Sequence, residues 1–285
     1  MEHPGVTSRL LPVASIAVWE IYLTSLAAWP GIDSRGASTM YIVSDSRLSW
    51  PRSSGHWDYG VKVFACKESA DIFGYYGDVL VPSMVLPRLA EASVLSDNVG
   101  SDTRHSTVHA LVKSAADVLP VSRKFEFGIV HASRHGKGMK SQYRLWHLRW
   151  SSIAGWADAE EPMGSNSALL IHLGSGGRII RNNAASSQAE LGIVSRGVFT
   201  GFCDGLTSGE DPDSGGAPQL VGLYRHGTGR HFGIVYCGRK YYRGIESPSL
   251  DLPDLQWKNE LLEDCDPLTR ARLPGAQAHP RLRKG

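Results

Sequence analysis

The chain has 285 residues, of which 42% are hydrophobic and 20% charged, and its formal net charge is +2. These values are ordinary for a globular protein, and so small a net charge gives no electrostatic reason to expect a nucleic-acid partner. No apolar run reaches the roughly 18 residues that a membrane-spanning helix needs, so we expect no membrane partner.

The cysteines are far apart in the sequence and form no CxxC pair. This spacing signals neither a zinc site nor a disulfide framework, so we expect reduced thiols, no metal, no cofactor and a cytoplasmic location. Residues 1–23 loosely imitate a signal peptide, because Arg9 precedes an apolar stretch. However, Pro12 interrupts that stretch and Glu20 follows it, which disfavours secretion.

The first part of the chain predicts strands. Short β-compatible runs at 25–30 and 39–44, joined by a loop of turn-forming residues, predict a hairpin. Residues 46–60 are polar and rich in Pro and Gly, which indicates a loop. Residues 61–66 and 72–76 predict a second pair of strands.

Helices and a further hairpin follow. Residues 78–93 have a helical composition, although Pro87 would bend or split a helix there. Residues 105–119 carry apolar side chains at i, i+3, i+4 spacing, which predicts a regular helix. Alternating apolar side chains at 124–132 and 142–150 predict two strands of a hairpin.

The last part returns to the same pattern. We expect a polar loop at 151–166, a buried strand at 168–173, one or two helices within 186–206 and a loop at 210–216. A short helix is expected at 255–262. Further short strands are predicted at 219–224, 231–236 and 240–242. This order of elements predicts an α+β domain in which helices enclose two packed sheets.

We expect three parts along the chain. Residues 1–23 form an N-terminal extension, 24–250 form the domain, and 251–285 form a C-terminal extension. After Asp266 the extension is basic and contains prolines, which favours a mobile, solvated tail.

An ordered set of polar residues lies at the ends of the predicted strands. Thr24, Asp45 and Lys62 supply a hydroxyl, a carboxylate and an ammonium group, and two Gly-rich loops follow at 174–177 and 211–216. This set, from about Thr24 to Gly244, resembles the N-terminal-nucleophile hydrolases. It looks most like proteasome β-subunits and the related bacterial ATP-dependent ring peptidase.

The resemblance implies the fold of that superfamily, a four-layer αββα sandwich of two antiparallel sheets between helices. It also implies a nucleophilic hydroxyl on Thr24, deprotonated by the residue's own free α-amine. Lys62 would stand beside Thr24 as an ammonium, held by Asp45. A backbone N–H at Gly77, or less favourably at Gly74, would form the oxyanion hole.

The two Gly-rich loops complete the implied site. Ser175, Asp211 and Ser214 would form a polar shell around the Thr24 amine. Ser25 is a second candidate nucleophile, but a strand turns neighbouring side chains to opposite faces, so it ranks below Thr24.

The sequence departs from the family at the processing site. Proteasome β-subunits free their threonine by cutting a Gly–Thr bond, whereas Leu23 precedes Thr24 here. We therefore consider two routes to a free amine. The chain cleaves itself between Leu23 and Thr24, or translation begins at Leu23 and the initiator Met is then removed.

The resemblance implies a peptide or amide substrate, a ring or other homo-oligomer, and an ATPase unfoldase as a possible partner. Two alternatives stay open: a catalytically silent domain used for assembly or binding, like proteasome α-subunits, and a lone small-molecule amidase. His105 and His109 have the i, i+4 spacing of a metal-binding pair. No acidic third ligand accompanies them in the sequence, which favours an exposed helical pair.

Overall fold

The computed structural model describes residues 24–50, 55–92, 95, 98–247, 249, 252 and 254–276. Within these ranges the chain combines helices with mostly antiparallel sheets, so the predicted α+β class is confirmed. The predicted extension 1–23 and the most basic part of the tail, from 277 on, lie outside the described residues.

One five-stranded sheet carries the start of the domain and has the order β10-β1-β2-β11-β12. Its strands are β1 (Leu26–Asp33), β2 (Gly36–Ser44), β10 (Ile171–Leu173), β11 (Gln219–Tyr224) and β12 (Arg230–His231). β1 and β2 form the predicted hairpin, with Leu26 opposite Ser44. The same ends meet β10 and β11, because Leu26 also pairs with Leu173, and Gln219 pairs with Ser44.

A second five-stranded sheet has the order β5-β6-β7-β8-β9. Its strands are β5 (Val63–Ala65), β6 (Asp71–Gly77), β7 (Phe127–His135), β8 (Gln142–Ser151) and β9 (Gly155–Glu161). β9 occupies part of the predicted loop 151–166, so that prediction is wrong. The strand lies at an edge and pairs with β8 alone, and its acidic, partly exposed side chains lack the apolar alternation of a buried strand.

Two smaller sheets complete the strands. A four-stranded sheet has the order β15-β14-β13-β16, and β3 pairs with β4. The bounds are β3 (Leu48–Ser49), β4 (His56–Trp57), β13 (Gly233–Tyr236), β14 (Arg239–Tyr242), β15 (Ile245–Glu246) and β16 (Trp257–Asn259). β16 replaces the predicted helix 255–262, which is wrong. Trp257 is buried against Gly233, where a Cβ would stand 2.4 Å from the indole ring, and this packing overrides local propensity.

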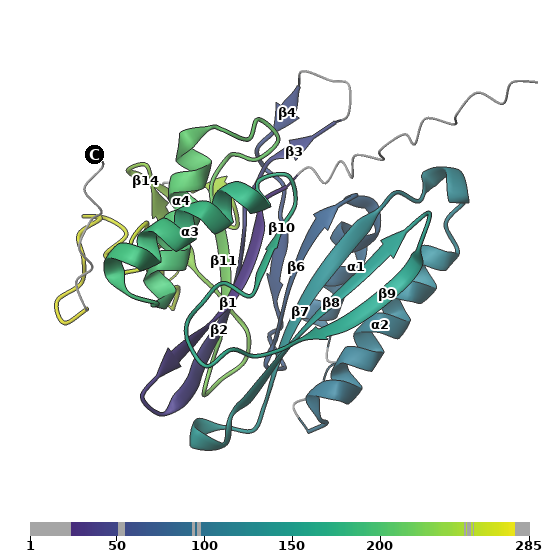
Figure 1. The fold of residues 1–285 in the computed structure, drawn as a ribbon, viewed down its shortest axis with the longest axis horizontal. Coiled ribbons are helices and arrows are strands. Elements are labelled where there is room, and N and C mark those ends of the chain that lie inside the picture. Colours follow the sequence, from purple (N-terminus) through teal and green to yellow (C-terminus); the bar gives the residue numbers. More distant parts are fainter. Residues whose placement is uncertain are drawn as a thin grey trace, which may run out of the picture.

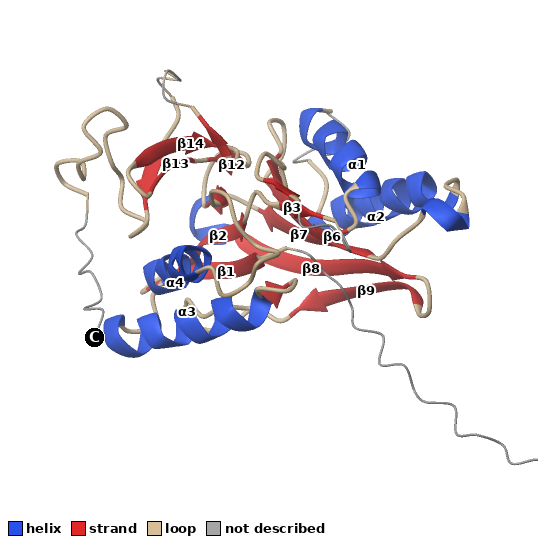
Figure 2. Ribbon diagram, turned by 90° about the horizontal axis from the view of Figure 1, so that it is seen from above, coloured by secondary structure: helices blue, strands red, loops and turns tan. Residues whose placement is uncertain are grey.

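The helices are α1 (Leu80–Glu91), α2 (Ser101–Asp117), α3 (Gly177–Leu191) and α4 (Ser195–Ser208), with short 3-10 turns η1 (Val121–Arg123) and η2 (Gly138–Lys140). Pro87 lies inside α1. Figures 1 and 2 show α3 and α4 along the outer side of the β1–β2 sheet, and α1 and α2 along the outer side of the β6–β8 sheet.

The buried side chains form separate clusters that match this arrangement. One cluster joins the two sheets and includes Leu26, Ile42, Val63, Ile72 and Val130. A second joins β1 and β2 to α3 and α4 and includes Trp29, Val43, Ile180, Phe199 and Phe202. A third joins the other sheet to α1 and α2 and includes Phe73, Tyr75, Leu86, Val108 and Val112. Burial of each such side chain contributes about 1.5–3 kcal/mol to folding.

Among the described residues, no helix is long and apolar enough to cross a membrane.

Candidate active site

The candidate site lies where several strands of one sheet begin or end. The pairing of Leu26 with both Ser44 and Leu173 fixes the start of β1 beside the ends of β2 and β10. Thr24 and Ser25 precede β1, Asp45 follows β2, and the Gly-rich loop 174–177 follows β10. Strand register therefore brings together residues that are far apart in the sequence.

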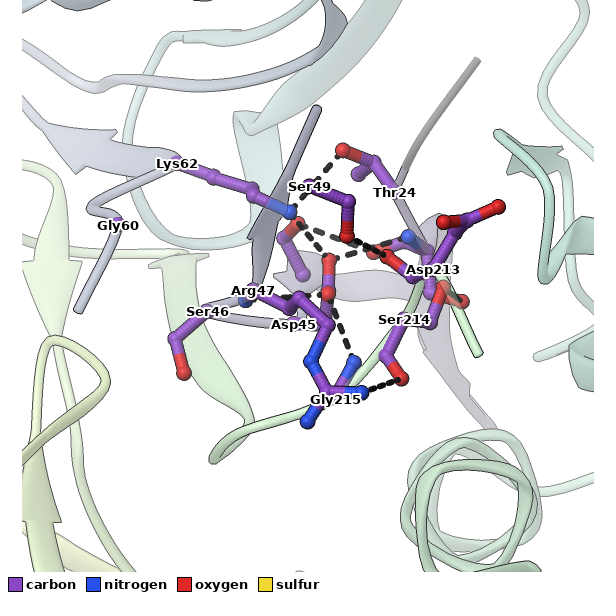
Figure 3. Close-up of polar contacts among 12 residues, drawn as sticks. Thr24, Asp45, Ser46, Arg47, Ser49, Gly60, Lys62, Asp213, Ser214 and Gly215 are labelled. Carbon is purple, nitrogen blue, oxygen red and sulfur yellow. Dashed lines mark hydrogen bonds and ion pairs between the residues drawn. The ribbon is translucent and has the colours of Figure 1, made fainter. Parts of the chain in front are cut away.

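Lys62 connects Thr24 to Asp45. Its Nζ atom lies 3.0 Å from Thr24 Oγ1 and 2.7 Å from Asp45 Oδ1. Figure 3 marks contacts of the Lys62 amine with dashed lines. The side chains of Lys62 and Asp45 are fully buried. Burial lowers the pKa of the Lys62 ammonium, and the charge and hydrogen bond of Asp45 oppose that shift. Water does not screen the pair, so the ammonium acts strongly on the hydroxyl beside it.

Backbone N–H groups hold the carboxylate of Asp45. Oδ1 accepts a hydrogen bond from Ser25 N (3.0 Å), and Oδ2 accepts from Arg47 N (3.2 Å) and Gly215 N (3.0 Å). Buried charges need such partners, because removal from water is otherwise costly. Asp45 is therefore fixed in position independently of Lys62.

The serines and the aspartate predicted as a polar shell also come together. The hydroxyl of Ser175 donates to Asp211 Oδ2 at 2.7 Å and accepts from Thr24 N at 3.4 Å. Ser214 Oγ lies 2.6 Å from Asp211 Oδ2, and Ser25 Oγ donates to Ser214 Oγ at 2.7 Å. Asp211 thus organises the hydroxyls next to the backbone nitrogen of Thr24.

The Gly-rich loop after β10 requires its glycines. A Cβ at Gly174, which has φ of 85°, would stand 1.9 Å from Thr24 O, and a Cβ at Gly176 would stand 1.9 Å from Ser25 Oγ. Only glycine lets this backbone approach the start of β1 so closely.

The predicted oxyanion glycines stand at different points of β6. Gly77 ends the strand with φ of 81°, and a Cβ there would stand 2.6 Å from Glu126 O. Gly74 faces the other sheet, since its Cβ would stand 2.7 Å from Ile42 and 2.8 Å from Leu26. Packing alone therefore accounts for Gly74, and the oxyanion role of Gly77 stays a prediction.

Arg47 and Asp58 belong to the site but were missed by the sequence analysis. Arg47 Nε and Nη2 lie 2.7 and 2.9 Å from the two carboxylate oxygens of Asp58, and Nη1 donates to Pro212 O at 3.1 Å. The guanidinium also packs on Gly215, where a Cβ would stand 2.4 Å from Cζ. The pair clamps loop 211–216 onto the segment after β2. Its only sequence signal is the position of Arg47, two residues after Asp45.

Gln219 was missed as well, although it begins a predicted strand. Its Nε2 donates to Asp45 O (2.9 Å) and Gly60 O (2.7 Å), and its Oε1 accepts from Lys62 N (3.2 Å). One buried amide thus fixes the backbone of both charged residues. No local pattern marks a glutamine for this task.

His105 differs from expectation. It was predicted to form an exposed pair with His109, but it is buried, and Asp158 contacts both imidazoles. The prediction is wrong because Asp158 comes from β9, the strand that the sequence pattern hid. Across the described residues, no group of three or more His, Cys, Asp or Glu side chains is arranged to hold a metal ion.

Comparisons with known proteins add little. No protein-family model matches the chain, and no curated protein sequence matches it. A solved structure, described as the Anbu (Gly-1) mutant from Hyphomicrobium sp. strain MC1, is 12% identical and covers 73% of this chain and 86% of its own, with a TM-score of 0.46. A likeness at this TM-score carries no inference about the present chain.

Proposed function

We propose that the chain is a threonine-type N-terminal-nucleophile hydrolase that cleaves amide or peptide bonds, on the αββα sandwich of that superfamily. The observation that carries the proposal is Lys62 Nζ within hydrogen-bond distance of both Thr24 Oγ1 and Asp45 Oδ1. The buried clusters between the sheets and beneath each helix pair support the layering.

The reaction begins with attack of Thr24 Oγ1 on the substrate carbonyl carbon. The hydroxyl proton passes to the free α-amine of Thr24, whose unperturbed pKa of about 7.7–8.0 suits a base at neutral pH. Lys62, as an ammonium, stabilises the developing alkoxide. The N–H of Gly77 stabilises the tetrahedral oxyanion. Collapse of that intermediate breaks the amide bond, and the leaving amine takes the proton from the α-ammonium group.

Water completes the cycle. The α-amine accepts a proton from water as the water attacks the carbonyl carbon of the Thr24 ester. When that intermediate collapses, the bond from the carbonyl carbon to Oγ1 breaks, the α-ammonium returns the proton to Oγ1, and the carboxylic acid product leaves. Ser175 orients the amine, since its hydroxyl is 3.4 Å from Thr24 N. Asp211 and Ser214 hold Ser175 and Ser25, and the Arg47–Asp58 clamp keeps their loop in place. These residues position the base and do not react.

The mechanism requires Thr24 to be the first residue of the working protein. Cleavage between Leu23 and Thr24, or translation from Leu23, provides that state. A homo-oligomer, and delivery of substrate by an ATPase unfoldase, enter the proposal only through the family resemblance. If Thr24 never becomes N-terminal, the alternative is a silent domain of the same fold used for assembly or binding.

The test uses a chain whose first residue is Thr24, prepared by removing a fusion partner. A β-lactone or epoxyketone probe directed at N-terminal threonine is added. We expect one covalent adduct on Thr24. The matched control carries one extra Ala before Thr24, and a second control carries Thr24→Ala. Absence of the adduct from the Thr24-first chain, or equal labelling of the Ala-capped chain, would contradict the proposal.

A further inference from the structure

A second buried ionic cluster lies under α2, on the side of the molecule that Figure 1 shows covered by that helix. Its contacts form a row. His131 Nε2 is 2.9 Å from Asp71 Oδ1, His131 Nδ1 is 3.0 Å from His105 Nδ1, and His105 Nε2 is 2.9 Å from Asp158 Oδ1. Asp71 and His131 are fully buried and His105 is 6% exposed. The proposed hydrolase mechanism uses none of them.

The row has a definite proton requirement. Each of its contacts, Asp71–His131, His131–His105 and His105–Asp158, needs one proton to be a hydrogen bond. Ionised carboxylates supply none, and two neutral imidazoles supply one each, which leaves one contact without a proton. If both rings were protonated, the Nδ1–H groups of His105 and His131 would point at each other and could not form a hydrogen bond. One neutral ring and one histidinium satisfy every contact.

We propose that His131 and His105 share one extra proton at neutral pH, and that this histidinium fastens α2 to the sheet and makes the stability of the fold depend on pH. The proton belongs to the pair, since the two rings are directly hydrogen-bonded to each other. The inference does not depend on the proposed hydrolase function.

The charges around the pair agree with one extra proton. Arg104 Nε lies 2.8 Å from Asp71 Oδ2, so those two charges cancel, and one histidinium balances Asp158. Among the described residues, other titratable or charged groups near the row include His109 on Asp158, His147, on which the charge of Asp158 also acts, and Arg144 over Trp146 with its partners Asp102 and Glu160. Removal of the shared proton would leave the partly buried carboxylate of Asp158 without a positive partner in the row, which is costly.

The rings are also packed tightly. His105 stacks on Trp146 with centroids 4.4 Å apart and an interplanar angle of 4°, and His131 stacks on Phe73 at 4.8 Å. These stacks fix both imidazole planes, so the pair cannot relieve a missing or surplus proton by turning. Because the rings come from α2 and β7, the shared hydrogen bond joins helix to sheet.

The pKa shifts of Asp71 and His105 support one extra proton on the pair. Burial alone would raise the pKa of Asp71, but His131 and Arg104 hold it below its usual value, so the carboxylate is ionised. Burial and the neighbouring His131 lower the pKa of His105 to about 4. The pair therefore does not take up a second extra proton until the solution is well below neutral pH.

The direction of the pH dependence follows. Unfolded histidines titrate near pH 6.5. Above that pH the folded pair keeps one proton that the unfolded chain has lost, so stability falls as pH rises. Below it the unfolded chain binds two protons where the folded pair binds one, so stability falls as pH drops toward about 4. The contribution of the pair is greatest near pH 6.5.

The direct test is NMR of the histidine ring nitrogens in the folded chain. At pH 7.5 an ordinary histidine is protonated in only about one molecule in ten. We expect one ring of the pair with both nitrogens protonated at this pH, and loss of that signal in Asp158→Asn. The amide of that variant can donate to His105 Nε2, so the row no longer needs the extra proton. Only neutral rings in the wild-type pair at pH 7.5 would overturn the proposal.

Urea unfolding provides the second test. Each proton held only by the folded state raises the unfolding equilibrium constant tenfold per pH unit. Between pH 7 and 8.5 we expect the wild-type constant to rise with pH more steeply than that of Asp158→Asn, by up to tenfold per unit. Glu161→Gln makes the same charge change on the opposite face of β9 and should keep the wild-type slope. Equal slopes in all three proteins would contradict the shared proton.

Discussion

Two buried ionic clusters in the described part of the chain differ in which of their groups remain available for reaction. In the first, Lys62 reaches from Asp45 to the hydroxyl of Thr24. In the second, the His131–His105 pair lies between two carboxylates, and both nitrogens of each ring have a partner. The first cluster ends at the hydroxyl of Thr24, a candidate nucleophile. In the second cluster every ring nitrogen already contacts another member of the row.

This difference separates a reactive arrangement from a structural one. A buried charge alone does not indicate catalysis, because ion-pair networks that only stabilise the fold also perturb pKa values. Lys62 faces the hydroxyl of Thr24, the residue that the proposed function requires to be N-terminal. Within the described residues, the hydrogen bonds of the histidine pair go to carboxylates and to each other, and not to a hydroxyl, thiol or amine. We therefore expect the first cluster to control reaction rate and the second to control stability.

The largest expected effect comes from breaking the first cluster at Lys62. In the Thr24-first chain, Lys62→Met removes the ammonium that stabilises the alkoxide, and we expect the rate of probe labelling to fall about a thousandfold, near 4 kcal/mol. Lys67→Met alters an exposed lysine five residues further along and should label at the wild-type rate. Unchanged labelling of Lys62→Met would show that Lys62 has no part in the chemistry.

The same cluster should respond differently when its acid is neutralised. Asp45→Asn leaves the Lys62 ammonium buried without a counterion and turns an amide toward backbone N–H donors. We expect a loss of about 3–5 kcal/mol in the free energy of unfolding, measured with urea. Lys62→Met should cost less, because backbone donors still hold Asp45. The reverse order of stabilities would contradict this account of the site.

A partly buried histidine outside the row, His147, sharpens the comparison with the pair. His147 contacts the hydroxyl of Tyr76 at 2.8 Å, and burial lowers its pKa to about 4. Below pH 6.5 the unfolded chain binds a proton at this residue, whereas His147 in the folded chain stays neutral until about pH 4. The free energy of unfolding therefore falls as pH drops. His147→Gln should reduce the loss of unfolding free energy between pH 7 and pH 5 by about 1–2 kcal/mol. The slope above pH 7 should not change; a change there would mean that the alkaline effect is not specific to the pair.

The smallest expected effect concerns the clamp beside the first cluster. Asp58→Asn weakens its paired contact with Arg47, and because both side chains are partly exposed we expect only about 1 kcal/mol of stability to be lost. Labelling of the Thr24-first chain should slow about tenfold, because loop 211–216 is held less firmly. Glu68→Gln, at an exposed acid, is the matched control. A wild-type labelling rate in Asp58→Asn would exclude the positioning role.

The sequence predicted the strands that converge on the site because short β-compatible runs bounded by turn-forming residues are a local pattern. It could therefore place Thr24, Asp45 and the loop 174–177 at strand ends. The clamp, the buried Gln219 and the histidine row depend on contacts between residues far apart in the chain, which no local pattern records. β9 was not predicted because it is an edge strand with polar side chains, and the position of Asp158 on that strand was therefore not predicted either. The positions of the candidate site residues at strand ends were thus more predictable than the packing that supports them.

The central claim is most directly tested by the intact mass of the protein produced from its native gene, measured before and after treatment with the threonine-directed probe. We expect a chain that begins at Thr24 and gains the mass of one probe molecule, with the adduct mapped to that residue. A chain that retains residues 1–23 and gains no mass would contradict the hydrolase proposal. It would favour the alternative, a catalytically silent domain used for assembly or binding.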